Sequence, residues 1–277
     1  QLDVITKERL QLESQITYLT KQHDEALKQV QQLQAQQVIA EEEAAKLRNR
    51  LEMLTRNYKQ LSDDAAASSG KQEETINNVL LRLADLLTEN TEKIIQENKK
   101  DLVGMTEDDA LKDRVMLDEK RVADMAASVR QIAGYLSPIG NILEEKKLPN
   151  GLELKKVTVP FGTVGAIFEA RPNVLIDTFA LCFKSRNACV MKGGSQAANS
   201  NAILTELILR AIEECGADKN LVLLLSNDRE LMNEFLKMVD YVDVIIPRGS
   251  QSLIDFVREN SLIPVIETGR GVCHTYI

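Results

Sequence analysis

The chain has 277 residues, of which 44% are hydrophobic, and it carries a formal net charge of −8 at pH 7. This apolar content is enough for a packed core in one large domain or two smaller ones. Because the charge is negative and the Lys and Arg residues are spread along the chain, the composition argues against a protein that binds nucleic acid or an anionic membrane surface.

The cysteines and histidines give no sign of a metal site. They are Cys182, Cys189, Cys215, Cys273, His23 and His274. No CxxC pair and no ligand spacing typical of zinc is present, so reduced thiols in the cytoplasm are the plain interpretation. No apolar run approaches the roughly 20 residues that a membrane helix needs, and we expect no membrane association. Because the sequence begins with Gln1, we expect a fragment, a processed chain or an excised segment.

The first 62 residues have a heptad pattern. One set of positions is entirely apolar, namely Ile5, Leu12, Leu19, Ala26, Leu33, Ala40, Leu47, Leu54 and Leu61. The companion set alternates apolar with polar residues, which favours a parallel two-stranded coiled coil. We therefore expect residues 1–62 to form a coiled-coil helix and the protein to be a homodimer or a higher homo-oligomer. The alternative is a long amphipathic helix packed on its own domain, but about 60 residues would span about 90 Å.

A different pattern begins after the heptads. Ser62–Gly70 is small and polar and predicts a linker or helix break, so we place a second domain at residues 63–277. Apolar spacing predicts a helix pair over Glu73–Asn98 and a further helix over Met116–Tyr135. The alternation in Leu152–Val159 predicts a strand that pairs with a neighbour.

After Pro160, short apolar strands alternate with helices. The predicted strands are Val164–Glu169, Ala188–Lys192, Leu221–Leu225, Val242–Ile246 and Ile263–Ile266. The predicted helices are Val174–Ser185, Asn199–Cys215, Arg229–Met238 and Gln251–Asn260. This order predicts an α/β fold, a doubly wound parallel sheet with helices on both faces. Val272–Ile277 is predicted to be a further strand.

Polar segments follow four of these strands. They are Arg171–Asn173, Lys192–Ser195, Pro247–Ser250 and Glu267–Gly271. In a doubly wound sheet the ligand lies beyond the carboxyl ends of the strands, so all four are expected at one edge. No GxGxxG fingerprint is present, and the usual dinucleotide-binding turn is therefore not expected.

These segments carry a resemblance to a known family. They read VTVPFGTVGAIFEARPNVLIDT at 157–178, KGGS at 192–195, IIPRGS at 245–250 and VIETGRGVCH at 265–274. Over roughly residues 65 to 277 the chain resembles the gamma-glutamyl phosphate reductase family of the aldehyde dehydrogenase superfamily. The resemblance implies an oxidoreductase of proline biosynthesis that uses NADPH to reduce L-glutamyl 5-phosphate to L-glutamate 5-semialdehyde and phosphate. It also implies glutamate 5-kinase as a partner.

The resemblance assigns roles to two candidate catalytic residues. Asn173 stands where the superfamily places an amide that donates to the oxyanion, although an Asn after Pro172 is also a common helix N-cap. Glu267 matches the glutamate that activates water for hydrolysis, but a reductase gains nothing from hydrolysis, so we expect a positioning role at most. Arg171 is a candidate for binding an anionic substrate group, with a surface salt bridge as the alternative.

The expected cofactor is NADP. The resemblance places Lys192 where the superfamily has a strand-end lysine that contacts the adenosine ribose. A solvated lysine at the end of a strand is the alternative. Ser195 occupies a position where enzymes that prefer NAD often carry a glutamate, and its small neutral side chain leaves room for a 2′-phosphate. Gly249 and Ser250 open a helix whose N–H groups are candidates for binding a cofactor phosphate, with Arg248 beside them. An ordinary Ser N-cap and an Arg salt bridge are the alternatives.

No cysteine in this sequence matches the nucleophile of the family. Adjacent strand residues point to opposite faces, so Cys273 and His274 are not expected to act as a nucleophile and base. The resemblance implies that the nucleophilic cysteine belongs to a segment beyond Ile277. We therefore expect a cofactor domain that lacks most of the catalytic lobe and binds cofactor without turnover. Arg270, where the family usually has a small residue, departs from the pattern.

Two other functions fit the same sequence. One is an interaction protein in which the coiled coil is the working part and the reductase-like domain is inactive. The other is an acylating aldehyde dehydrogenase with a different substrate. The remaining cysteines, Cys182, Cys189 and Cys215, fall in helical or strand patterns and are expected to be small core residues.

Overall fold

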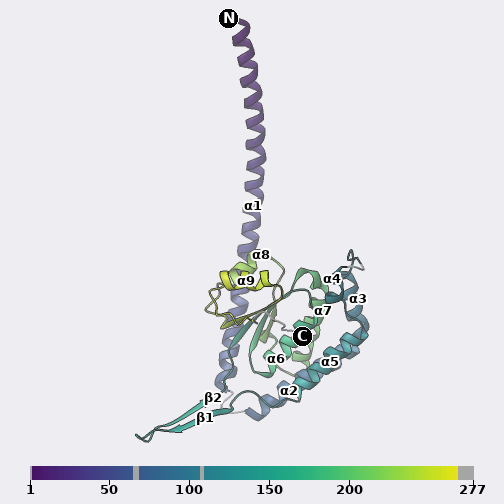
Figure 1. The fold of residues 1–277 in the computed structure, drawn as a ribbon, viewed down its shortest axis with the longest axis vertical. Helices are drawn as coiled ribbons and strands as arrows, with labels where there is room; N and C mark the ends of the chain where they lie inside the picture. Colours follow the sequence, from purple (N-terminus) through teal and green to yellow (C-terminus); the bar gives the residue numbers. More distant parts are fainter. Residues whose placement is uncertain (1, 65–68, 107–108, 268–277) are drawn as a thin grey trace, which may run out of the picture. The chain divides into compact units, whose positions relative to one another are not determined.

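The computed structural model describes residues 2–64, 69–106 and 109–267 (Figure 1). The chain divides into two units, Gln1–Arg48 and Asn49–Ile277. Within the described ranges, no helix combines the length and the apolarity needed to cross a bilayer.

The first unit is helical. Its residues 2–48 belong to α1 (Leu2–Asp64), so the predicted long N-terminal helix is confirmed. Of the apolar heptad positions that can be assessed in this unit, Leu19, Val30 and Leu33 are 60%, 48% and 64% exposed, whereas Ala44 and Leu47 are buried. A stripe of this kind is what a paired helix would cover, and the pairing itself stays a prediction.

The second unit begins within the same helix. Leu51 is fully buried, and Thr55 Oγ1 donates to the carbonyl oxygen of Tyr241 at 3.4 Å. α1 ends at Asp64 and α2 (Ser69–Glu89) begins at Ser69, so the ends of the predicted break are helical and its middle, residues 65–68, lies outside the described residues. The division into a coiled-coil helix at residues 1–62 and a second domain at residues 63–277 therefore remains a prediction.

Three helices follow α2 before the first strand. α2 and α3 (Thr91–Asp101) confirm the predicted helix pair, and α5 (Glu119–Ala133) confirms the next helix. The six-residue α4 (Ala110–Val115) was not predicted, because its charged sequence offers no apolar period. α2 and α5 pack along each other (Figure 1).

A hairpin precedes the main sheet. β1 (Ile142–Lys147) pairs antiparallel with β2 (Glu153–Val157), which confirms the predicted paired strand. Both strands are exposed at every position, so the hairpin buries neither of its faces.

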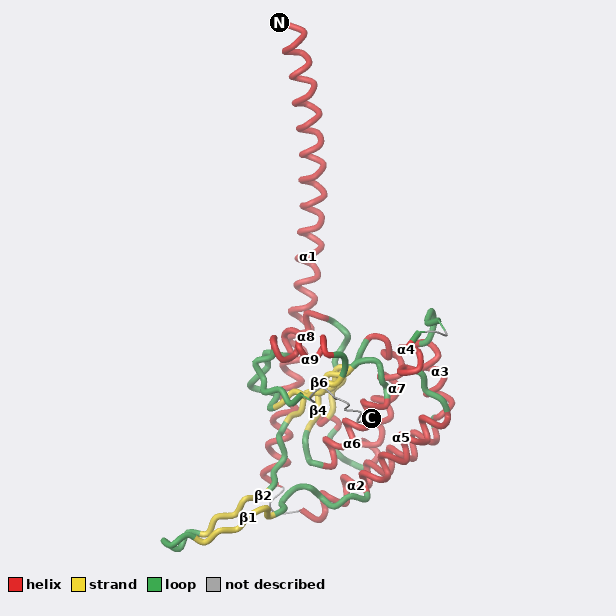
Figure 2. Tube along the Cα trace, in the orientation of Figure 1, coloured by secondary structure: helices red, strands yellow, loops and turns green. Residues whose placement is uncertain are grey.

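Four parallel strands form the sheet in the order β5-β4-β3-β6. They are β3 (Thr163–Phe168), β4 (Ala188–Lys192), β5 (Val222–Leu224) and β6 (Val244–Arg248). Figure 2 labels β4 and β6 of this sheet. The chain runs outward from β3 to β5 and then returns to the other side of β3. The strand order therefore reverses between β3 and β6, which is where doubly wound sheets bind ligands.

The connecting helices agree with the sequence prediction. They are α6 (Asn173–Lys184), α7 (Ala198–Glu214), α8 (Arg229–Phe235) and α9 (Gln251–Asn260), with short 3₁₀ turns at Ser195–Ala197 and Lys219–Leu221. The predicted strand Ile263–Ile266 is reduced to a single parallel bridge between Ile245 and Val265. The predicted strand 272–277 lies outside the described residues.

The sheet is covered on both faces, which confirms the doubly wound architecture. Val164, Ala166 and Phe168 of β3 belong to the main core, together with apolar side chains of α2, α5, α6 and α7. The alternate residue Gly165 points to the other face, because successive strand residues alternate. There the ring of Phe235 from α8 packs so closely that a Cβ on Gly165 would lie 2.8 Å from Phe235 Cζ.

Because of this close approach, we expect a side chain at position 165 to destabilise the fold. Gly165→Ala should lower the free energy of unfolding by about 1–3 kcal/mol, because the added methyl group overpacks the contact with Phe235. The measurement is urea unfolding followed by circular dichroism. The control is Gly134→Ala at the end of α5, where the nearest atom to the new Cβ lies 3.4 Å away. Equal effects of the two substitutions would contradict the packing argument.

Candidate functional site

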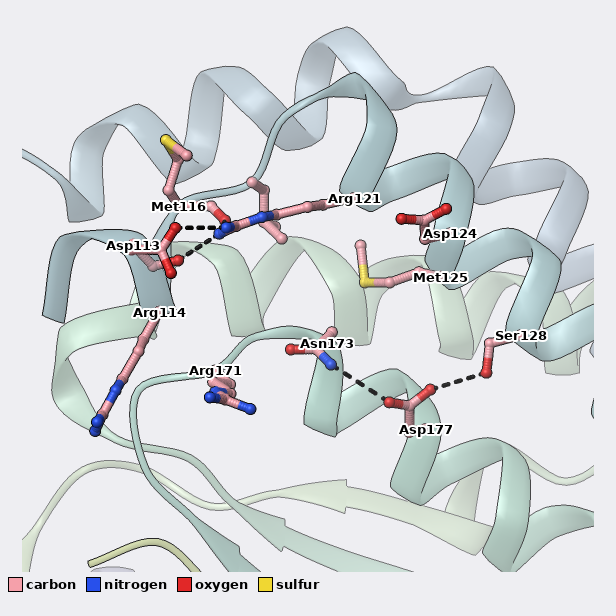
Figure 3. Close-up of a pocket in the computed structure, with 11 residues that line it drawn as sticks. Asp113, Arg114, Met116, Arg121, Asp124, Met125, Ser128, Arg171, Asn173 and Asp177 are labelled. Atoms are coloured by element: carbon pink, nitrogen blue, oxygen red, sulfur yellow. Dashed lines mark hydrogen bonds and ion pairs between the residues drawn. The ribbon is translucent and has the colours of Figure 1, made fainter. Parts of the chain in front are cut away.

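A cavity at the carboxyl edge of the sheet lies at the reversal point. Its volume is about 1020 Å³, and it is lined by the ends of β3 and β6 and by the start of α6. A second cavity of about 380 Å³ lies between α4, α5 and α6 (Figure 3). The two cavities share four lining residues, Arg114, Arg171, Asn173 and Asp177. We call them the sheet-edge pocket and the helix pocket.

The sheet-edge pocket gathers part of the predicted site. Asn173, Arg248, Gly249 and Ser250 line it together, as does Arg171. These residues come from the ends of β3 and β6, which are paired in parallel, so the sheet itself brings them to one place.

Three predicted site residues do not line either pocket. Lys192 is half-buried at the end of β4, where its Nζ donates to the carbonyl oxygen of Gly193 at 3.1 Å and burial lowers its pKa. Ser195 is exposed at the start of a 3₁₀ turn. Glu267 is exposed and forms an ion pair with Arg258 at 3.6 Å.

Asn173 is the first residue of α6 and belongs to a hydrogen-bonded chain. Its Nδ2 donates to Asp177 Oδ2 at 3.4 Å, and Ser128 Oγ donates to Asp177 Oδ1 at 3.2 Å (Figure 3). Pro172 occupies the N-cap position and Asn173 caps nothing, so the N-cap alternative is wrong. One N–H of the Asn173 amide is engaged by Asp177, and the other is available to an acceptor in the pocket.

Sequence reasoning missed Asp177 and Ser128. The signal for Asp177 was its position four residues after Asn173 on one helix face. Ser128 comes from α5, far away in sequence, and no local pattern relates it to α6.

The helix start at Ser250 already holds an anionic group. Ser250 is the N-cap of α9, with Oγ accepting from the N–H of Leu253 at 3.4 Å. The carboxylate of Glu169 accepts from the Ser250 backbone N–H and from Ser250 Oγ, each at 2.7 Å. A carboxylate at a helix N-terminus is stabilised by the free N–H groups and the helix dipole.

Gly249 makes room for this carboxylate. A Cβ at position 249 would lie 2.7 Å from Glu169 Cδ, so the close approach requires glycine or a movement of Glu169. Glu169 was not among the predicted site residues. Its place directly after β3, opposite the end of β6, was the available signal.

The arginines of the two pockets differ in their partners. Arg114, Arg171 and Arg248 are exposed and form no ion pair with any residue that the structure describes. The salt-bridge alternatives for Arg171 and Arg248 are therefore not realised in the described part of the chain. Arg121, by contrast, binds Asp113 Oδ1 at 2.6 Å.

Cys189 and Cys215 are poor nucleophiles, because the pKa of each thiol is raised. Cys182 lines the sheet-edge pocket but is buried in the core, and its hydrogen bond to Cys189, followed by burial, raises the pKa of the Cys189 thiol. Burial also raises the pKa of Cys215. A thiol held neutral reacts slowly, which agrees with the expectation of small core residues. Cys273, His274 and Arg270 lie outside the described residues.

Comparison with known proteins identifies relatives. Gamma-glutamyl phosphate reductase of Chlorobium limicola is 49% identical over 205 residues, which are 74% of this chain and 49% of that protein. The crystal structure of gamma-glutamyl phosphate reductase from Thermotoga maritima is 31% identical, with a TM-score of 0.72 over 80% of this chain and 54% of that one. The chain is homologous to the gamma-glutamyl phosphate reductases. It spans about half the length of the curated relatives that it matches.

The fold extends to the wider superfamily. An acetylating aldehyde dehydrogenase from Geobacillus thermoglucosidasius superposes with a TM-score of 0.60 at 18% identity, over 84% of this chain and 48% of that one. At this identity the likeness concerns the fold, and it agrees with the predicted aldehyde dehydrogenase-like architecture. No protein-family model matches the chain.

The contacts of Ser250 predict a measurable effect on stability. Ser250→Ala should cost about 1 kcal/mol of unfolding free energy, because α9 loses its N-cap and Glu169 loses a donor. Ser195→Ala is the matched control and should change stability by less than about 0.5 kcal/mol, because that side chain is exposed. Both values come from urea unfolding curves. A neutral Ser250→Ala would show that the cap contributes nothing to stability.

Proposed function

We propose that this protein takes part in the NADPH-dependent reduction of L-glutamyl 5-phosphate to L-glutamate 5-semialdehyde, as its relatives' name suggests. In the balanced reaction one acyl phosphate, one NADPH and one proton give one aldehyde, one NADP⁺ and one phosphate. The observation that carries the proposal is the sheet-edge pocket at the β3–β6 reversal point, lined by Asn173 and by arginines that have no ion-pair partner among the described residues.

Asn173 is the residue that would touch the reacting carbonyl. Its free Nδ2–H would donate to the carbonyl oxygen, where negative charge develops when a nucleophile adds to the carbonyl carbon. An amide does not titrate, so this donor would act at any physiological pH. Asp177 would hold the amide with its nitrogen toward the pocket.

The residues present fit a nicotinamide dinucleotide. The donors of Ser250 already hold a carboxylate, so their chemistry suits a phosphate oxygen once Glu169 has moved. Gly249 leaves no side chain in the way, and Arg248 supplies a positive charge without a described partner. When bound, NADPH would supply the hydride for the reduction.

Two further residues would select NADPH over NADH. Lys192 ends β4, which pairs with β3, so it lies on the same sheet edge and could reach the adenosine ribose. Ser195 supports the choice of NADP because it offers no carboxylate to repel a 2′-phosphate. For Glu267 we keep a positioning role at most, because it forms an ion pair with Arg258 and lines neither pocket.

The competing functions are less well supported. An inactive reductase-like domain carried by a working coiled coil is not favoured, because the similarity to gamma-glutamyl phosphate reductases is 49% identity over 74% of the chain. An acylating aldehyde dehydrogenase with another substrate is less favoured, because the acetylating enzyme shares only 18% identity.

The decisive test is a fluorescence titration of the purified chain with NADPH and NADH. We expect NADPH to bind more tightly than NADH. Glu169→Ala should tighten NADPH binding by about tenfold, because the cofactor no longer displaces a carboxylate held by two hydrogen bonds. Glu259→Ala removes an exposed carboxylate elsewhere on α9 and should leave binding unchanged. Absence of binding to both nucleotides would rule out the proposed function for this chain.

Homodimerisation through α1 and a contact with glutamate 5-kinase are the proposed partnerships. The exposed apolar stripe of Leu19, Val30 and Leu33 supports the first. The contact with the kinase is proposed on chemical grounds. An acyl phosphate hydrolyses in water, so direct transfer from the kinase to this protein would protect it. We place the protein in the cytoplasm because its described cysteines are free thiols.

The dimer makes a separate prediction. The double substitution Leu19→Glu and Leu33→Glu should turn a dimer into a monomer in sedimentation equilibrium, because it places charges in the paired seam. The double substitution Gln31→Glu and Gln32→Glu adds the same charge at outward heptad positions and should leave the dimer intact. A wild-type chain that sediments as a monomer would refute the proposed coiled-coil dimer.

A further inference from the structure

The helix pocket contains two arginines without a counter-charge. Arg114 comes from α4 and Arg171 from the segment between β3 and α6, and both side chains are exposed. Neither forms an ion pair or hydrogen bond with any residue in the described ranges. Both also line the sheet-edge pocket. Two guanidinium groups in one wall repel each other unless an anion lies between them.

The neighbouring charges do not neutralise this pair. Asp113 is engaged by Arg121 at 2.6 Å, and Asp177 receives hydrogen bonds from Ser128 and Asn173. In Figure 3 the two arginines lie on one side of Asn173, and Asp177 and Ser128 lie on the other. The pocket therefore has a cationic side and an anionic side, with the Asn173 amide between them.

The backbone that carries each arginine is fixed by buried contacts. Asn98 is 1% exposed, and its Nδ2 donates to the carbonyl oxygen of Val115 at 2.8 Å while its Oδ1 accepts from the N–H of Leu117 at 2.8 Å. These bonds hold the end of α4, next to Arg114. Arg171 lies between Ala170 and Pro172, which are both buried. Unpaired side chains on fixed backbone are typical of a preorganised ligand site.

We propose that Arg114 and Arg171 form the subsite for the phosphate of the acyl phosphate substrate, distinct from the cofactor-phosphate site at Ser250. The phosphate group of an acyl phosphate carries two negative charges near neutral pH, which two guanidinium groups match by bidentate hydrogen bonds. The subsite adjoins Asn173, so a phosphate bound there would be attached to a carbonyl within reach of the amide. The assignment rests on the proposed function for the identity of the ligand.

The acidic side of the pocket completes the match to the substrate. Asp124 is exposed and has no described partner, and Asp177 lies beside Asn173. An α-ammonium group at this side would face carboxylates while the phosphate at the far end of the same molecule faces arginines. The volume of about 380 Å³ accommodates a ligand of this size.

The test uses inorganic phosphate as the probe on the full chain, followed by ³¹P NMR line broadening at constant ionic strength. Arg114→Gln and Arg171→Gln should each weaken phosphate binding about tenfold. Arg114→Lys should lose less than Arg114→Gln, because it keeps the charge but not the bidentate geometry. Arg130→Gln is the control, since it removes one exposed charge of α5 outside both pockets. Circular dichroism checks that each variant is folded.

Titrations with NADPH and NADH separate this subsite from the cofactor site. We expect the two arginine variants to bind both nucleotides as the wild type does, and saturating NADPH to leave phosphate binding within about twofold. Loss of NADPH binding with NADH binding spared would assign the arginines to the cofactor 2′-phosphate and overturn the proposal. Equal weakening by Arg130→Gln, or no phosphate binding to the wild type, would overturn it too. Failure of the proposed function would appear instead as absent nucleotide binding, with phosphate binding intact.

Discussion

The site depends on the pairing of β3 with a parallel strand on each side. β4 and β6 both run alongside β3, in registers that pair Ile167 with Lys192 and Phe168 with Arg248. Each strand end then delivers its polar segment to the same edge, where Glu169 can meet Ser250 and Asn173 can reach the pocket. Gly165 belongs to the same constraint, because its missing side chain lets Phe235 pack directly against the middle strand.

Much of the fold follows from local patterns in the sequence. The strand Ala188–Lys192 and the helix Gln251–Asn260 have the predicted bounds, because each combines a clear apolar period with a polar or capped end. The apolar pattern did not predict α4, because three of its six residues are charged. It also overestimated Ile263–Ile266, since apolar residues there find only one bridge partner at the sheet edge.

Residues of the site could be predicted from the sequence only where they lie close after the end of a predicted strand. Gly249 and Ser250 follow β6 directly, Asn173 opens the helix after β3, and the pocket brings the three together. Arg114 and Ser128 lie on helices that precede the sheet in sequence, and only tertiary packing carries them to the pocket. Glu169 was overlooked for another reason: an acidic residue after a strand has many uses, and its partner Ser250 is 81 residues away.

The arginines that lack a described partner also affect the association rate of anionic ligands. The chain as a whole is acidic, with a net charge of −8, so a distant anion is on average repelled. Arg114, Arg171 and Arg248 line the sheet-edge pocket and carry charge of the opposite sign, with no ion-pair partner among the described residues. Opposing fields of this kind guide an approaching anion away from the general surface and toward the opening. The association rate of anionic ligands should therefore respond to salt more steeply than the overall charge alone would suggest.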